Sequence, residues 1–193
     1  MKRLLNTSIV GVDPSPRGIT GLTYIENGVI ESVLAVPGGL LPVLQLILPV
    51  LYVTNEEQTI DIFIEEPVHV MNPATYRDQI HMIERLQATM RALSIVRPVE
   101  TYIVNPSQVR AAMGLKRGEK KLQAWEKFQN SHFGLETSPA AKEDLYAFRR
   151  PEREACIDAI GVALAGIKRY YIEASDRVQP GFNDSDEPSD AEA

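Results

Sequence analysis

The feature that most constrains this chain is a short β-rich run that ends on a single carboxylate. Residues 7–13, Thr-Ser-Ile-Val-Gly-Val-Asp, have the composition of a buried strand and finish at Asp13. Turn chemistry follows at once, and two further β-rich runs cover 19–25 and 29–36, joined by Asn27-Gly28. A carboxylate at the tip of a central strand suits an anchor for a hard cation. An Asp before Pro is also a common turn former, so Asp13 alone does not decide between the two.

A second strand-like run also ends on acids. Residues 59–66 read Thr-Ile-Asp-Ile-Phe-Ile-Glu-Glu, and Pro67 stops the run. The period of two along a strand favours Glu65 as the inward-facing group, with Glu66 as the alternative. If this run pairs with residues 7–13, its terminal carboxylate converges on Asp13.

The remaining elements follow from periodicity and turn signals. Apolar positions between 74 and 96 recur at spacings of three and four, which predicts an amphipathic helix lying on a sheet. By similar patterns we expect helices at 40–53, from about 108, at 120–128 and at 152–171, and a short strand at 99–104. Residues 131–150 show no regular period. The order predicts an α/β fold, a mixed five-stranded sheet flanked by helices, in a single domain over residues 1–172.

The last helix supplies two more candidate acids. Glu154 and Asp158 are four residues apart and therefore project from one helix face. Each acid by itself is typical of a solvated strand end or helix face. Together with Asp13 and Glu65, however, they would repel strongly unless cations lay between them. Oxygen-only ligands select Mg²⁺, with Mn²⁺ as a possible substitute, and two such ions can promote phosphodiester hydrolysis.

Charge is distributed unevenly along the 193 residues. The net charge is −6, but residues 173–193 hold seven of the 26 acids and only one of the 20 bases. The first 172 residues are therefore neutral, and six bases gather between 106 and 130. The global acidity thus excludes neither a nucleic-acid substrate nor any other partner. We expect residues 173–193 to be a disordered acidic tail.

The cysteine content and the search for leader and membrane-spanning segments predict the cellular context. Cys156 is the one cysteine and lies in an apolar helical stripe, which predicts a packing role and a reducing compartment. The first residues show no leader pattern, and the apolar window 40–53 is too short to cross a bilayer. We expect a cytoplasmic protein, in a bacterium or a phage-infected cell, with no membrane partner.

The motifs together resemble those of a known family. The run from Ile9 through Asp13 to Gly21, then Phe63-Ile-Glu65 with Asn72 shortly after it, the segment Val109 to Lys121, and Glu154-Ala-Cys-Ile-Asp158 look like the RuvC-type Holliday-junction resolvases of the RNase H-like nuclease superfamily. The resemblance covers roughly residues 7–170. It implies an RNase H-like fold and a homodimer that nicks two symmetric strands of a four-way DNA junction with Mg²⁺, through a two-metal mechanism.

The resemblance also implies roles for individual residues. Asp13, Glu65 and Asp158 match the metal-binding acids, and Lys120 or Lys121 matches a lysine near the scissile phosphate. Further candidates for DNA contact lie in the same matching segments and the basic stretch: Arg17, His69, Asn72 and Arg117. We expect the homodimer to use apolar surface from the helix at 76–93.

Two departures from the family pattern point to a phage-type member. The family commonly has an acid three residues before the final Asp, where this chain has Ala155, so Glu154 must serve as the fourth ligand. Cellular members carry an aromatic residue after the glutamate that wedges into the junction, where this chain offers Val68 or His69.

Other interpretations stay open from the sequence. An RNase H-like nuclease for other branched DNA or for RNA–DNA hybrids would carry the same acids. A non-catalytic nucleic-acid-binding relative would tolerate their loss. An actin-like ATP-binding protein also ends its first strand on Asp, but 193 residues cannot hold the two domains that such a fold needs.

Overall fold

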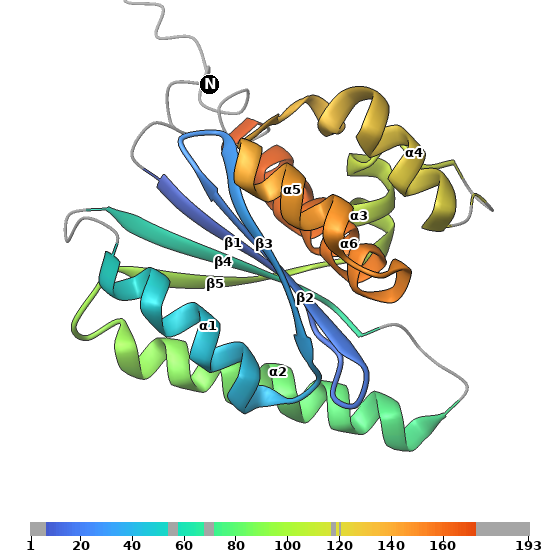
Figure 1. Cartoon of the computed structure of the whole chain (residues 1–193). Coiled ribbons are helices and arrows are strands. Elements are labelled where there is room, and N and C mark those ends of the chain that lie inside the picture. The colour runs from blue at the N-terminus through green and yellow to red at the C-terminus, as the bar shows by residue number, and fades with distance from the viewer. Residues whose placement is uncertain (1–6, 54–57, 68–71, 117–118, 120, 173–193) are drawn as a thin grey trace, which may run out of the picture.

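A mixed six-stranded sheet forms the centre of the molecule (Figure 1). The computed structural model describes residues 7–53, 58–67, 72–116, 119 and 121–172. The strands are β1 Thr7–Asp13, β2 Ile19–Glu26, β3 Val29–Pro37, β4 Thr59–Glu65, β5 Val99–Val104 and β6 Glu136–Thr137. Their order across the sheet is β5-β4-β1-β2-β3-β6. The β1–β2 and β2–β3 pairs are antiparallel, and the other three pairs are parallel.

Helices cover both faces of this sheet. They are α1 Leu40–Val53, α2 Pro73–Leu93, α3 Pro106–Ala112, α4 Lys121–Ser131, α5 Pro139–Ala147 and α6 Arg150–Gly166, with a 3₁₀ turn, η1 His132–Gly134, and a π-helical turn, η2 Ile167–Ile172. Figure 1 shows α1 and α2 on one face and α3 to α6 on the other. The structure is a single α/β domain of three layers, as the sequence predicts.

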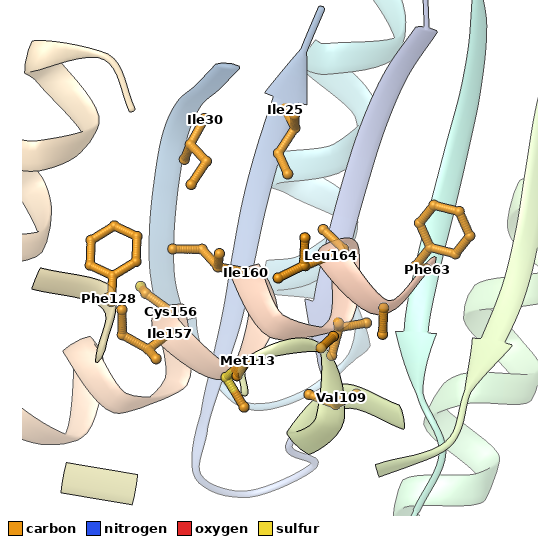
Figure 2. Packing of buried hydrophobic residues seen from close by; sticks show 14 of the residues in the cluster. Ile25, Ile30, Phe63, Val109, Met113, Phe128, Cys156, Ile157, Ile160 and Leu164 are labelled. Carbon is orange, nitrogen blue, oxygen red and sulfur yellow. The ribbon is translucent and has the colours of Figure 1, made fainter. Parts of the chain in front are cut away.

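Each face of the sheet buries its own apolar core. Beneath α1 and α2 lie alternate residues of the central strands, such as Val12 and Ile64. On the opposite face α6 runs through a larger core in which Ile25, Phe63 and Phe128 pack around it (Figure 2). Strand alternation therefore sorts the two cores. Helix α6 is buried along most of its length. The polar side chains that it carries therefore have little freedom to move.

Three regions differ from the sequence-based expectation. The sheet has six strands rather than five, because the two residues of β6 pair with β3. The stretch 131–150, for which no element was expected, contains η1, β6 and α5; α5 buries only Ala141 and Leu145, too few to show a period. The last helix becomes π-helical at Ile167. The expected acidic tail, 173–193, lies outside the described residues.

The core around α6 also accounts for the single cysteine of the sequence. Cys156 is fully buried, as the apolar stripe predicts. Among the described residues, none of the helices combines the length and the apolar character needed to cross a membrane.

Candidate active site

Two of the candidate acids lie side by side at one edge of the sheet. Asp13 is the last residue of β1, and Glu65 is the last residue of β4. The two strands are parallel neighbours whose register pairs Val12 with Ile64, so both carboxylates occupy the next position. Both residues are half-buried. Ligands of open α/β sheets commonly bind outside the carboxyl ends of the strands, which is where these acids lie.

Alternation along β4 separates its two terminal acids. Phe63 packs into the core around α6, whereas Ile64 packs beneath α1 and α2. Successive side chains of a strand point to opposite faces, so Glu65 shares the α6 face with Phe63. Glu66 lies beyond the strand, is exposed, and accepts a hydrogen bond of 3.0 Å from Nδ2 of Asn105 at the start of α3. Of the two, Glu65 is therefore the acid on the α6 face.

Close approach of α6 puts Asp13 on the same face. A methyl group at Gly21 would lie less than 3.0 Å from the carbonyl oxygen of Ala155. A methyl group at Gly11 would be equally close to the carbonyl oxygen of Ala159. Gly11 is two residues before Asp13, and Gly21 is its partner across the β1–β2 ladder. Only glycine lets the helix and strand backbones approach so closely, so α6 lies against the carboxyl end of β1.

Asp158 reaches this region from α6 itself. Its side chain is almost completely enclosed, at 8% exposure. Gly161, one turn later, packs against Met113 at the end of α3, and residues three apart share a side of a helix. Asp158 thus lies on the side of α6 that faces α3. Asp13 and Glu65 lie on the face of the sheet that this helix covers.

Glu154 is held differently. Its Oε1 pairs with Nε of Arg150 at 2.8 Å, one turn earlier on the same helix. Ala155, which occupies the position of the expected acid, is 6% exposed and packs on the sheet. The carboxylate nearest to that position is therefore engaged in an ion pair along α6.

The donor set has the chemistry of a hard-cation site. No three His, Cys, Asp or Glu side chains of the described residues are grouped tightly enough to hold a metal ion. Asp13, Glu65 and Asp158 nevertheless offer only carboxylate oxygens, the ligands that Mg²⁺ and Mn²⁺ prefer. The thiol of Cys156 does not compete, because burial, aided by the charge of Glu152, raises its pKa to about 12. The donor chemistry of these residues therefore suits Mg²⁺.

Solved structures of two proteins share this arrangement of elements. RuvC of Thermus thermophilus in complex with a Holliday junction substrate matches with a TM-score of 0.54 and 16% identity, over 82% of this chain and 91% of that one. The yeast mitochondrial Holliday junction resolvase Ydc2 matches with a TM-score of 0.58 and 12% identity, over 90% of this chain and 85% of that one. The chain has the RuvC-type fold. No protein-family model and no curated protein sequence matches it.

A second Thermus thermophilus RuvC structure agrees. Its TM-score is 0.54 at 16% identity, and the match covers 87% of this chain and 96% of the other. The RuvC-type fold predicted from the sequence is thereby confirmed, and the phage-type origin stays a prediction.

Two of the DNA-contacting candidates on this RuvC-type fold already have protein partners. Arg17, in the β1–β2 loop, is exposed and pairs with Asp78 of α2 at 2.5 Å. Asn72 is the N-cap of α2, and its side-chain oxygen accepts hydrogen bonds from the amides of Ala74 and Thr75. A cap of this kind satisfies helix amides that otherwise lack partners. The structure therefore gives Asn72 a structural role that its position in the motif did not suggest.

The basic segment is described only in part. His69, Arg117 and Lys120 lie outside the described residues, and of Lys121 the structure describes only its backbone, at the start of α4. Around them, Glu119 accepts hydrogen bonds from the amide of Lys116 and from Nζ of Lys127 at 2.7 and 3.0 Å. These contacts lower the pKa of the Glu119 carboxyl group, the backbone amide contributing most.

Aromatic residues of α4 pack rather than project. Phe128 is buried, and Trp125 stacks on it with ring centroids 6.0 Å apart. The guanidinium of Arg153 lies 4.7 Å from the Trp125 ring centroid, a cation–π contact. Both rings therefore pack with the core cluster around α6.

Proposed function

We propose that this protein is an Mg²⁺-dependent endodeoxyribonuclease that resolves four-way DNA junctions as a homodimer. The observation that carries the proposal is that Asp13 and Glu65 end neighbouring parallel strands on the face of the sheet covered by α6, the helix that carries Asp158. The RuvC-type fold supports it, because the solved relatives are named as Holliday-junction proteins.

The acids at the carboxyl ends of β1 and β4 and on α6 would be the metal ligands. Asp13, Glu65 and Asp158 would supply carboxylate oxygens, with Glu154 as a fourth ligand if it exchanges Arg150 for the ion. When bound, Mg²⁺ in a two-metal arrangement activates a water and stabilises the leaving oxygen of a phosphodiester. The chain's own part is to bring carboxylates from three separate elements together and to hold them there against mutual repulsion.

Basic side chains near this edge would position the phosphate backbone. Arg17 is 69% exposed, and a phosphate could replace Asp78 as its partner without displacing buried groups. We include Lys120, Lys121, Arg117, His69 and Asn72 in the DNA-binding surface, with Lys120 closest to the scissile phosphate. Contacts of this kind fix orientation and make binding dependent on salt.

A homodimer follows from the symmetry of the reaction. Paired cuts across a two-fold junction need two active sites related by a two-fold axis. We expected the interface to use apolar surface of α2, but the helix buries Ile83, Leu86 and Met90 in the core beneath it. Exposed apolar surface lies instead beside them: Tyr52 at the end of α1 is 79% exposed, and Val96 after α2 is 87% exposed.

These residues border an apolar groove that suits a second copy of the chain. The groove has a volume of about 370 Å³, and its lining is Leu48, Leu51, Tyr52, Leu93, Val96 and Arg97. Helix α1 contains no charged residue along its 14 positions. An uncharged helix beside a groove favours association through this face.

Junction cleavage tests the function. Purified protein with Mg²⁺ is incubated with labelled four-way, Y-shaped and linear duplex DNA. Nicks in a pair of strands related by the symmetry of the junction are expected. Equal cleavage of all branched substrates would instead favour a general branched-DNA nuclease, and cleavage of none would refute the proposal.

The dimer is tested independently of cleavage. Light scattering at micromolar concentration should give twice the chain mass, and Tyr52→Glu should shift the protein towards the monomer because it places a charge in the groove. Gln45→Glu on the exposed side of α1 is the matched control. A wild-type monomer that still cuts both strands together would contradict the dimer.

A further inference from the structure

The loop that follows Asp13 is tied to helix α2 by a side-chain contact. Nε2 of Gln79 donates a hydrogen bond of 2.9 Å to the carbonyl oxygen of Pro14, across 65 residues of sequence. Pro14 is buried, and Gln79 is half-buried. The contact therefore reaches from the α2 side of the sheet to the residue directly after a candidate metal ligand.

The backbone around this contact has few remaining degrees of freedom. Proline fixes its own φ and restricts the residue before it to extended conformations, so Asp13 stays extended. Pro14 has no N–H, which leaves its carbonyl as its one polar backbone group. A hydrogen bond to that carbonyl sets ψ of Pro14. Together these constraints fix the backbone at Asp13 and Pro14. They thereby fix the direction in which the Asp13 side chain leaves the end of β1.

The rest of the loop is held from the β2 and α1 sides. The amide of Ser15 donates to Oγ1 of the buried Thr20 at 2.9 Å, and Thr20 donates back to the Ser15 carbonyl at 3.1 Å. The amide of Gly39, before α1, also donates to that carbonyl at 3.1 Å. Pro14 thus has its carbonyl held from α2, whereas Ser15 is held from the β2 and α1 sides.

A neighbouring contact from the same helix is of a different kind. The Arg17–Asp78 pair is exposed on both sides and would yield to salt or to a phosphate. The Gln79–Pro14 bond is uncharged and partly enclosed, so it persists when DNA is bound. Only the second contact is suited to hold a catalytic carboxylate during the reaction.

We propose that Gln79 is a positioning residue for Asp13, acting through the Pro14 carbonyl to hold the carboxylate in its metal-binding orientation. This inference rests on the proposed function, in which Asp13 is a magnesium ligand. Gln79 contacts neither metal nor DNA, so its effect falls on metal affinity and turnover and not on junction binding.

Three substitutions test the donor itself. Gln79→Met keeps the length and helix propensity of the side chain but removes the donor. Gln79→Lys restores a donor one bond further out. Gln87→Met, two turns along α2 at a half-buried position, is the matched control.

We expect Gln79→Met to lower the cleavage rate at saturating junction by about ten- to a hundredfold, the usual effect of losing a residue that orients a metal ligand. The half-saturating Mg²⁺ concentration should rise, while KM for the junction and metal-free junction binding stay unchanged. Gln79→Lys should recover part of the rate. Gln87→Met should match the wild type throughout.

A readout without metal or substrate completes the test. In the metal-free protein, amide exchange at Ser15 and Gly39 should be faster in Gln79→Met than in Gln87→Met, because their hydrogen bonds lie next to the freed peptide. If the wild type cuts no junction, the proposed function fails, and this exchange alone judges the positioning. Unchanged exchange, or a loss of rate that only parallels a loss of folded protein, would overturn the inference.

Discussion

Strand β4 carries two acids on the same face, and the surroundings of the two acids differ between the two ends of the strand. Asp61 lies near the amino end and Glu65 at the carboxyl end, four residues apart and in phase. Asp61 is 6% exposed and accepts a hydrogen bond from the hydroxyl of Tyr171 in η2. Glu65 is half-buried and neighbours the carboxylate of Asp13.

Aromatic residues seal the amino end. Tyr170, beside Tyr171 in η2, stacks on Phe63 and lies over Tyr102, with ring centroids 5.7 and 4.4 Å away. Within the described residues, Oδ1 of Asp61 has no hydrogen-bond partner. Burial raises the pKa of Asp61, against the opposing effect of the Tyr171 hydroxyl, and nearby Glu100 raises it further.

The contrast teaches what distinguishes a structural acid from a candidate ligand. A single carboxylate closed off by a hydroxyl donor and aromatic rings can be kept neutral by a proton. If Asp13, Glu65 and Asp158 form one site, as we propose, three carboxylates cannot all be neutralised cheaply in that way, and a cation is the simpler solution. The predictions below test this difference between the two ends.

The largest expected effect is on catalysis at the carboxyl end. Asp13→Asn or Asp158→Asn should lower junction cleavage at least about a thousandfold, the scale of losing a catalytic group. Junction binding should stay intact or tighten, because a negative charge near a phosphate is removed. Asp61→Asn in the same assay should cut normally. A variant at Asp13 that cuts at the wild-type rate would show that the site is misassigned.

The two terminal acids of β4 should differ as their faces differ. Glu65→Gln should impair cleavage far more than Glu66→Gln, since Glu66 lies beyond the strand and pairs with Asn105. Rates are compared at saturating Mg²⁺ for both proteins. The reverse ranking would make Glu66, next to Asn105, the ligand in place of Glu65.

At the amino end the expected effect is on stability. Tyr171→Phe removes the hydroxyl that Asp61 accepts from and should cost about 1–3 kcal/mol of unfolding free energy, the price of an unsatisfied buried group. Denaturant unfolding measures it. Cleavage by the folded variant should be unchanged. A large loss of cleavage without loss of stability would mean that the two ends are functionally coupled.

The pH dependence of stability should report Asp61. Its pKa is raised in the folded state, so its contribution to stability is complete below the unfolded pKa and is lost as the pH rises through the folded pKa. Asp61→Asn removes this dependence. The wild type should therefore lose stability relative to the variant as the pH rises from acidic towards neutral, by less than the Tyr171→Phe effect. Parallel stability curves for the two proteins would contradict the raised pKa.

The smallest effect concerns the acidic residues 173–193, which follow η2 in the sequence. Truncation after Ile172 should tighten binding to linear duplex and steepen its salt dependence, because a tethered segment with a net charge of −6 would no longer compete with phosphate. Titrations at several salt concentrations compare the two forms. Superimposable curves would leave the segment with a role in solubility alone.

The sequence by itself predicted those parts of the fold that depend on local pattern. Strand alternation favoured Glu65 over Glu66 as the inward-facing acid, and the same period sorts Phe63 and Ile64 into separate cores. Helical spacing identified α2 and most of α6. These elements can be predicted because the positions on their buried face recur every two residues in a strand and about every 3.6 residues in a helix.

Tertiary structure alone decided which side chains meet. Tyr171 reaches Asp61 across 110 residues, and Gln79 reaches Pro14 across 65. The same holds for β6, which pairs with β3, and for α5, whose two buried residues join the core around α6. A polar contact between distant segments leaves no period in the sequence, because it depends on how complete elements pack and on which donors that packing leaves facing an acceptor.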